Sequence, residues 1–159
     1  MSLREQLEFY AKTGDRVSDY LLQFGTFFEP AHETQDYTPF KQFIRRVKVR
    51  ACYTNSVNAM ALHGLKYYEG YYYLDNMLIP LPHAFNLDEN GVLYDFTAHK
   101  FKFNVRSWVG VEIDTADILE SYEVERKLQL GILTPLQVKL HKHYLSLKQQ
   151  NEKDITSIH

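Results

Sequence analysis

The chain has 159 residues, a formal net charge of −2, and hydrophobic and charged shares of 45% and 24%. This length fits one domain with a hydrophobic core, and the composition excludes a disordered or fibrous chain. A net charge this close to zero argues against a global electrostatic field that would draw the protein to nucleic acid or to an anionic membrane.

The cysteine content limits the chemistry further. Cys52 is the one cysteine of the chain, so an intramolecular disulfide is excluded and the thiol is packing, a modification site or a nucleophile. No apolar run approaches the roughly 20 residues that span a bilayer. The first ten residues, MSLREQLEFY, lack the layout of a signal peptide. We therefore expect a cytoplasmic protein with a reduced thiol and no membrane association.

The first half of the chain predicts helices separated by a loop. Apolar residues recur at helical spacing over residues 3–24, with an interruption at Gly14, and two prolines with many polar residues predict a loop over 29–39. The run CYTNSVNAMALH at 52–63 predicts a helix that ends at Gly64. This helix has no strong N-cap residue before Cys52, so its start is less well defined than its end.

Strands and then helices are predicted for the second half. Strand patterns occupy residues 65–74, 79–87, 92–97 and 108–113. The turn signal DENG at 88–91 joins the second and third of these strands as a hairpin. Helices are predicted over 115–130, with a stop at Gly131, and from Thr134-Pro135 to about 149, followed by a frayed tail. The chain is expected to be a single α+β domain over 1–159, with a core at about 50–114 and helical flanks at 1–49 and 115–150.

Three residues have the types that nucleophilic thiol catalysis requires. Such catalysis needs a thiolate, a nearby imidazole and a group that orients the imidazole. Cys52 falls in the first turn of its predicted helix, where backbone N–H groups favour a negatively charged sulfur and can bind an oxyanion. A hairpin turned at residues 89–90 brings His83 opposite Asp95. We therefore expect Cys52 as nucleophile, His83 as general base and Asp95 as the residue that orients the histidine.

The strings CYTNS, YYEGYYY, PHAFN, LDENG, LYDFT and WVGVEID follow one another between Cys52 and Asp114. In this order they resemble a group of small bacterial and phage proteins. That group has a Cys-Tyr-x-Asn helix, a Tyr-x-Glu-Gly-Tyr strand, a His-Ala-Trp-Asn strand, a Gly turn, a Val-x-Asp-Pro-Thr strand and a closing aromatic-x-Gly-Val strand. It is similar to the papain-like and transglutaminase-like superfamily of thiol enzymes. The resemblance implies a papain-like core, in which a Cys-bearing helix packs on an antiparallel sheet, with the triad Cys52, His83 and Asp95.

The resemblance also implies supporting residues. Asn55, Glu69 and Asn86 are assigned to substrate binding or structural support, and Asn55 is expected to anchor the sheet or the loop before the cysteine. The sequence departs from the pattern at Phe85, where tryptophan is usual, and at Phe96, where proline is usual. Asn86 or Asn104 is the alternative orienter of the histidine ring, because papain itself uses an amide there.

A basic run and a tyrosine-rich segment are two further candidate surfaces. A basic run just before Cys52 is either a solvated face or a surface for an acidic partner, and it consists of Lys41, Arg45, Arg46, Lys48 and Arg50. The tyrosines at 67–73 are either packing or the wall of a cleft. The seven histidines lack companions at metal-ligand spacing, and no phosphate or dinucleotide motif is present, so we expect neither a metal nor a cofactor.

Two functions from different classes remain. The first is a cysteine-dependent hydrolase or acyl transferase that acts on a peptide, amide or protein substrate through an S-acyl enzyme. Peptidase, amidase, deamidase and transglutaminase activities are not distinguished, because they differ in the acceptor and not in the triad. The alternative is a catalytically inactive papain-like module that binds a protein or nucleic-acid partner.

Overall fold

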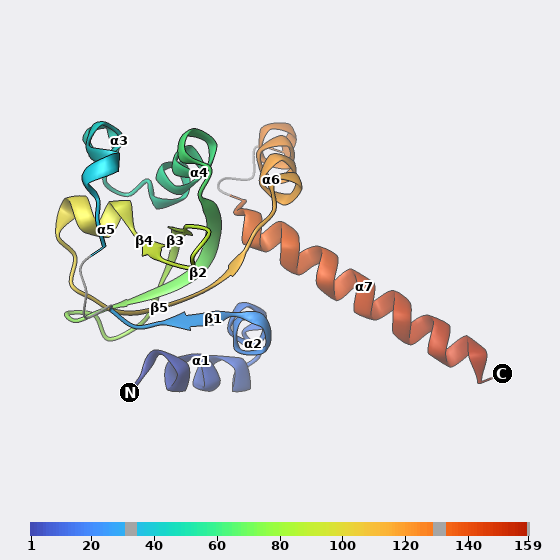
Figure 1. The fold of residues 1–159 in the computed structure, drawn as a ribbon. Helices are drawn as coiled ribbons and strands as arrows, with labels where there is room; N and C mark the ends of the chain where they lie inside the picture. The colour runs from blue at the N-terminus through green and yellow to red at the C-terminus, as the bar shows by residue number, and fades with distance from the viewer. Residues whose placement is uncertain (31–34, 129–132, 159) are drawn as a thin grey trace. The chain divides into compact units, whose positions relative to one another are not determined.

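The computed structural model describes residues 1–30, 35–128 and 133–158. The chain forms two compact units, Met1–Glu112 and Ile113–His159, each described by itself. The described residues form seven α-helices, one short 3₁₀ helix and a five-stranded antiparallel sheet (Figure 1). The expected α+β class is confirmed. That residues 1–159 make one domain stays a prediction.

The sheet and its register come from five strands in the order β1-β5-β2-β3-β4. Their bounds are β1 Thr26–Phe28, β2 Lys66–Leu74, β3 Leu81–Leu87, β4 Leu93–Tyr94 and β5 Val105–Glu112. The register pairs Gly70 of β2 with Gly110 of β5 on one side and with His83 of β3 on the other. A Cβ atom on Gly70 would clash with the carbonyl oxygen of Val109, so this close approach of β2 and β5 requires glycine.

Two helices lie side by side at the start of the first unit (Figure 1). α1 (Leu3–Lys12) begins with a capping box in which Ser2 and Glu5 bond each other's backbone, and α2 (Arg16–Phe24) begins at Asp15. Gly14 has φ +97°, so the predicted interruption falls where the chain needs a left-handed residue. Both helices contact β5.

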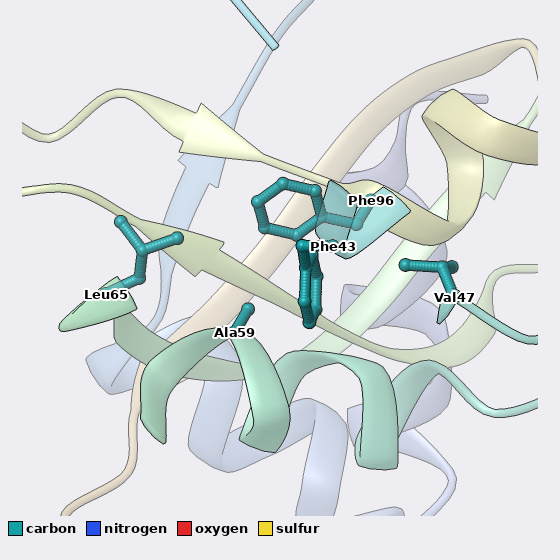
Figure 2. Packing of buried hydrophobic residues seen from close by; sticks show 5 residues of the cluster. All are labelled: Phe43, Val47, Ala59, Leu65 and Phe96. Carbon is teal, nitrogen blue, oxygen red and sulfur yellow. The ribbon is translucent and has the colours of Figure 1, made fainter. Parts of the chain in front are cut away.

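The remaining helices of this unit surround one apolar cluster. The 3₁₀ helix η1 (Thr38–Phe40) leads into α3 (Lys41–Arg46), and α4 (Cys52–His63) and α5 (Phe96–Phe101) follow. Figure 2 shows side chains from several segments meeting in the cluster, namely Phe43, Val47, Ala59, Leu65 and Phe96. Ala59 belongs to the Cys52 helix and Phe96 directly follows Asp95. This packing therefore fixes α4 relative to the residue expected to orient His83.

The second unit consists of α6 (Thr115–Leu128) and α7 (Pro135–Ser157). α7 begins at Pro135 with Thr134 as its N-cap, as its sequence predicts, and Thr134 also forms a capping box with Gln137. The prediction of a frayed tail was wrong, because α7 continues to Ser157. Within this part of α7, Gln150 Nε2 donates to Asp154 Oδ1 at 3.0 Å, an i,i+4 hydrogen bond that stabilises the helix. The predicted stop at Gly131 lies outside the described residues.

Within the described residues, no helix has the length and apolarity needed to cross a membrane. A cytoplasmic location stays a prediction.

Several predicted strand bounds were wrong. The predicted strand over 92–97 contains only the two residues of β4, because Asp95 accepts a bond from the backbone N–H of Ala98 and starts α5. β5 begins three residues earlier than expected, and β1 was not expected at all. The helix over 52–63 is confirmed, with Gly64 in the left-handed conformation at its end.

Candidate active site

A buried histidine and a buried aspartate form the centre of the site. His83 lies near the start of β3 and Asp95 caps α5. The His83 Nε2 atom lies 2.8 Å from Asp95 Oδ2, and the two side chains are only 2% and 3% exposed. The structure therefore brings together two of the three residues that the sequence assigns to catalysis.

Three further groups hold the Asp95 side chain and backbone. Trp108 Nε1 donates to Asp95 Oδ2 at 2.9 Å, and the Ala98 N–H donates to Oδ1 at 2.9 Å. The Asp95 N–H itself donates to the Tyr37 hydroxyl at 3.1 Å. With the N–H groups of Trp108 and Ala98 bonded to its two oxygens, the carboxylate is locked in one orientation, which is what the orienter of a catalytic imidazole must have.

The His83 ring is held by a stacked aromatic ring as well as by its hydrogen bond with Asp95. The Tyr72 ring stacks on it with centroids 3.9 Å apart and planes 7° from parallel. Tyr72 and Trp108 are register partners in β2 and β5, so adjacent strands supply the stacking ring and the indole donor. The imidazole therefore has little freedom to turn away from the position in which Nε2 faces Asp95.

The electrostatics of the pair favour a charged histidine. Burial by itself lowers the pKa of His83, but the Asp95 charge and side-chain hydrogen bonds with Asp95 and Cys52 raise it to about 9. Burial likewise acts to raise the pKa of Asp95, and the His83 charge and the hydrogen bonds from His83, Ala98 and Trp108 nevertheless lower it. The buried pair is thus stabilised as imidazolium and carboxylate.

Cys52 is the first residue of α4 and is partly exposed. Because Nε2 of His83 is engaged by Asp95, Nδ1 is the ring nitrogen left for the hydrogen bond with Cys52. No side chain caps the start of α4, where Ala51 is the N-cap, so the first-turn N–H groups remain available to an oxyanion. Arg50, two residues before the thiol, has φ +58°, a strained conformation of the kind that gathers at functional sites.

Asn55 supports the loop before the cysteine. Its Oδ1 accepts from the Lys48 N–H at 3.1 Å, and its Nδ2 donates to the Lys48 carbonyl at 2.8 Å and to Thr97 Oγ1 at 3.0 Å. The side chain is 5% exposed. Asn55 therefore ties the loop that leads into Cys52 to α4, and it ties α4 to α5.

The other two assigned residues are also buried supports. Asn86 Nδ2 donates to the carbonyls of Ser56 at 2.9 Å and Lys66 at 3.2 Å, so it joins α4 to the sheet and does not occupy the Asp95 position beside His83. Glu69 is 2% exposed and accepts at 3.0 Å from the Tyr67 hydroxyl. Its charge also helps to raise the pKa of Tyr53, after burial.

The register argument that placed Asp95 opposite His83 was wrong, although the two side chains do meet. β3 and β4 pair only at Asn86 with Tyr94 and at Leu87 with Leu93. Beyond this ladder the chain turns into α5, and Asp95 reaches His83 from the helix cap. The helix cap, which is a local property of Asp95 and Ala98, replaced the strand continuation that the hairpin rule assumes.

Sequence reasoning missed Trp108, Tyr72 and Tyr37 as members of this site. The sequence did contain one indication for Trp108. It is the one tryptophan of the chain, and a buried indole N–H needs a hydrogen-bond acceptor.

Two other sequence predictions concern exposed residues. Asn104, the alternative orienter of His83, has an exposed side chain. The expected basic surface is exposed at all five positions, and none forms an ion pair within the described residues: Lys41, Arg45, Arg46, Lys48 and Arg50.

Comparisons with known proteins add no family. No protein-family model, curated protein or solved structure matches the chain. The described residues also contain no group of three or more His, Cys, Asp and Glu side chains placed to hold a metal ion.

Proposed function

We propose that the protein is a papain-like thiol enzyme, a cysteine-dependent hydrolase or acyl transferase that acts on an amide or thioester through an S-acyl enzyme. The single observation that carries this proposal is the 2.8 Å contact of His83 Nε2 with Asp95, which leaves Nδ1 for a partly exposed thiol at a helix start. Cys52 is the nucleophile, His83 the base and acid, and Asp95 the positioning residue.

The chemistry follows from this arrangement. The Cys52 sulfur attacks the carbonyl carbon of a peptide, amide or protein substrate, and the oxygen that becomes negative is stabilised by N–H groups at the start of α4. When the C–N or C–S bond breaks, the His83 imidazolium gives its proton to the leaving amine or thiol. Water or an amine then attacks the S-acyl bond, His83 takes its proton, and Cys52 is released.

The proposed papain-like core rests on the relation of the elements. A helix with Cys52 at its first residue packs on β2 and β3 of an antiparallel sheet, and the residue after β4 binds the histidine of β3. The side chains of Asn55 and Asn86 fix that helix to its loop and to its sheet. These contacts support the fold that the motif resemblance implies.

An acylating probe tests the proposal. The intact protein is incubated near neutral pH with a panel of activated amide and ester substrates, and its mass is measured at early times. We expect an acyl adduct at Cys52 that decays with water or an added amine and is absent in Cys52→Ala. Lack of an adduct across the panel in folded wild-type protein would contradict the proposal.

A second candidate is the inactive binding module, and the exposed basic side chains near Cys52 favour it. Lys41, Arg45 and Arg46 lie on α3, and Lys48 and Arg50 lie on the loop that follows. Their positive charges suit an acidic protein or a nucleic acid. Binding of a single-stranded oligonucleotide or an acidic peptide that is lost when these five are neutralised, in a protein whose thiol is unreactive, would favour this candidate over the enzyme.

A further inference from the structure

A cavity of about 350 Å³ lies between α1 and the sheet, at the end of β3 that carries His83. Leu7 and Tyr10 of α1 and Tyr71 of β2 line it, together with Asp15. The rest of the wall is apolar and comes from the segment before His83, at Ile79, Pro80 and Pro82. Its volume falls at the small end of the roughly 300–1,000 Å³ typical of ligand pockets.

The cavity lies on the face of the sheet that the Cys52 helix covers. Asn86 of β3 donates to the Ser56 carbonyl of α4, and Pro82, four residues earlier in β3 and the register partner of Tyr71, points to the same face. Tyr53 follows Cys52 in α4, and its pKa is raised by burial and then by the charges of Glu69, Cys52 and Tyr71. A substrate bound at Cys52 can therefore extend a side chain past Tyr53 and Pro82 into this cavity.

The wall of the cavity is held by a buried polar contact. The Nε2 atom of Gln6 donates to the Leu78 carbonyl at 3.2 Å, and Gln6 is only 5% exposed. This bond ties the segment before β3 to α1. The bond keeps the two walls of the cavity at a fixed separation, so the cavity is present before a ligand arrives. Ligand binding then does not carry the conformational entropy cost of ordering this loop.

Asp15 gives the cavity its charge. Its Oδ2 accepts from the backbone N–H of Ser18 at 3.0 Å and from the Ser18 hydroxyl. Within the described residues its Oδ1 has no hydrogen-bond partner, so this oxygen remains available to a ligand. Burial, and then Asp15 and Tyr10, raise the pKa of Tyr71 to about 12, which keeps its phenol neutral beside the carboxylate.

We propose that this cavity is the specificity pocket for the acyl donor and that it takes a basic side chain with a long aliphatic stem, lysine or arginine. The stem packs on Leu7, Ile79 and the prolines, and the cationic head meets Asp15 and the ring and hydroxyl of Tyr71. Electrostatic complementarity then selects basic over neutral side chains of the same length. This inference rests on the proposed thiol chemistry at Cys52.

Paired thiol-directed probes test it. N-acetyl-lysine and N-acetyl-norleucine chloromethyl ketones have stems of similar length and differ in the ammonium group. We expect the lysine probe to label Cys52 at least about 10-fold faster than the norleucine probe in wild type. Asp15→Asn, which retains a good N-cap for α2, should remove most of that preference. Glu8→Gln removes a charge from an exposed position of α1 outside the cavity and should leave the preference intact.

A second variant covers the case in which Asp15→Asn fails to fold. Ile79 is 50% exposed, so Ile79→Lys is expected to fold and to repel the lysine probe from the cavity. Equal labelling by the two probes, with iodoacetamide still labelling Cys52, would overturn the pocket and leave the thiol enzyme standing. Failure of all three reagents to label folded protein would overturn the thiol chemistry, and this inference with it.

Discussion

Trp108 donates its indole N–H to the same Asp95 oxygen that contacts His83, at 2.9 Å. Trp108→Phe removes this donor and keeps most of the buried ring. Hydrogen bonds to charged groups contribute about 1.5–3 kcal/mol, so we expect the free energy of unfolding to fall by about that amount in denaturant titrations. The reactivity of Cys52 should fall less than in Asp95→Asn. An unchanged free energy of unfolding would show that the bond to Asp95 contributes nothing.

Asp95→Asn tests the orienting role directly. The amide keeps the shape of the carboxylate but removes its charge and leaves the histidine tautomer unspecified. We expect the rate of Cys52 alkylation at neutral pH to fall at least ~10-fold, which corresponds to about 1.4 kcal/mol of barrier.

Glu69→Gln is the matched carboxylate control and should reduce that rate much less. Glu69 is buried on β2, where it accepts a hydrogen bond from the Tyr67 hydroxyl. A silent Asp95→Asn, combined with loss of labelling in Asn86→Ala or Asn104→Ala, would transfer the orienting role to an amide.

The pH dependence of His83 follows from its raised pKa of about 9. Because this value exceeds the ~6.5 of an unfolded histidine, the protonated ring stabilises the folded state. That stability is fully present below about pH 6.5 and is lost as the pH rises through about 9. We expect ¹³C-edited NMR to find a histidine titrating near 9 in wild type. In Asp95→Asn burial dominates, so its pKa should drop below 6.5; a pKa unchanged by that substitution would contradict the coupling.

Asn55→Ala removes three hydrogen bonds that hold the loop before Cys52. We expect the free energy of unfolding to fall by about 2–3 kcal/mol, since two partly buried bonds to the Lys48 backbone and one buried bond to Thr97 are lost. Asn58→Ala is the control on the same helix, because Asn58 is exposed, and it should change stability by less than about 0.5 kcal/mol. Equal effects of the two substitutions would show that Asn55 does not support the loop.

Local sequence signals predicted much of the fold. The helix over 52–63 and its Gly64 cap follow from periodicity and from the left-handed conformation that glycine permits. The strand at 66–74 and the turn at 88–91 follow from tyrosine-rich β-propensity and from turn chemistry. These features depend on neighbours within a few residues, which a single sequence contains.

Features that depend on distant residues were not predicted. The β1 strand exists because three residues pair with β5 across about 80 positions of sequence, and nothing local specifies such a partner. β4 has only two residues because Asp95 caps the start of α5, so the chain turns into a helix where the strand was expected to continue. The roles of Tyr72 and Trp108 appear only when β2 and β5 lie side by side, so the sequence could suggest His83 and Asp95 but not the groups that hold them.

The most direct test of the central claim is the rate at which iodoacetamide alkylates Cys52 at pH 7, measured by intact mass. The same chain unfolded in urea supplies the rate for an ordinary thiol. In the proposed mechanism His83 activates the thiol at the partly exposed start of α4. We therefore predict that the folded protein reacts at least about 10-fold faster than the unfolded chain, and that His83→Gln removes this advantage. A folded protein that reacts no faster than its unfolded chain would contradict the assignment of Cys52 as a catalytic nucleophile.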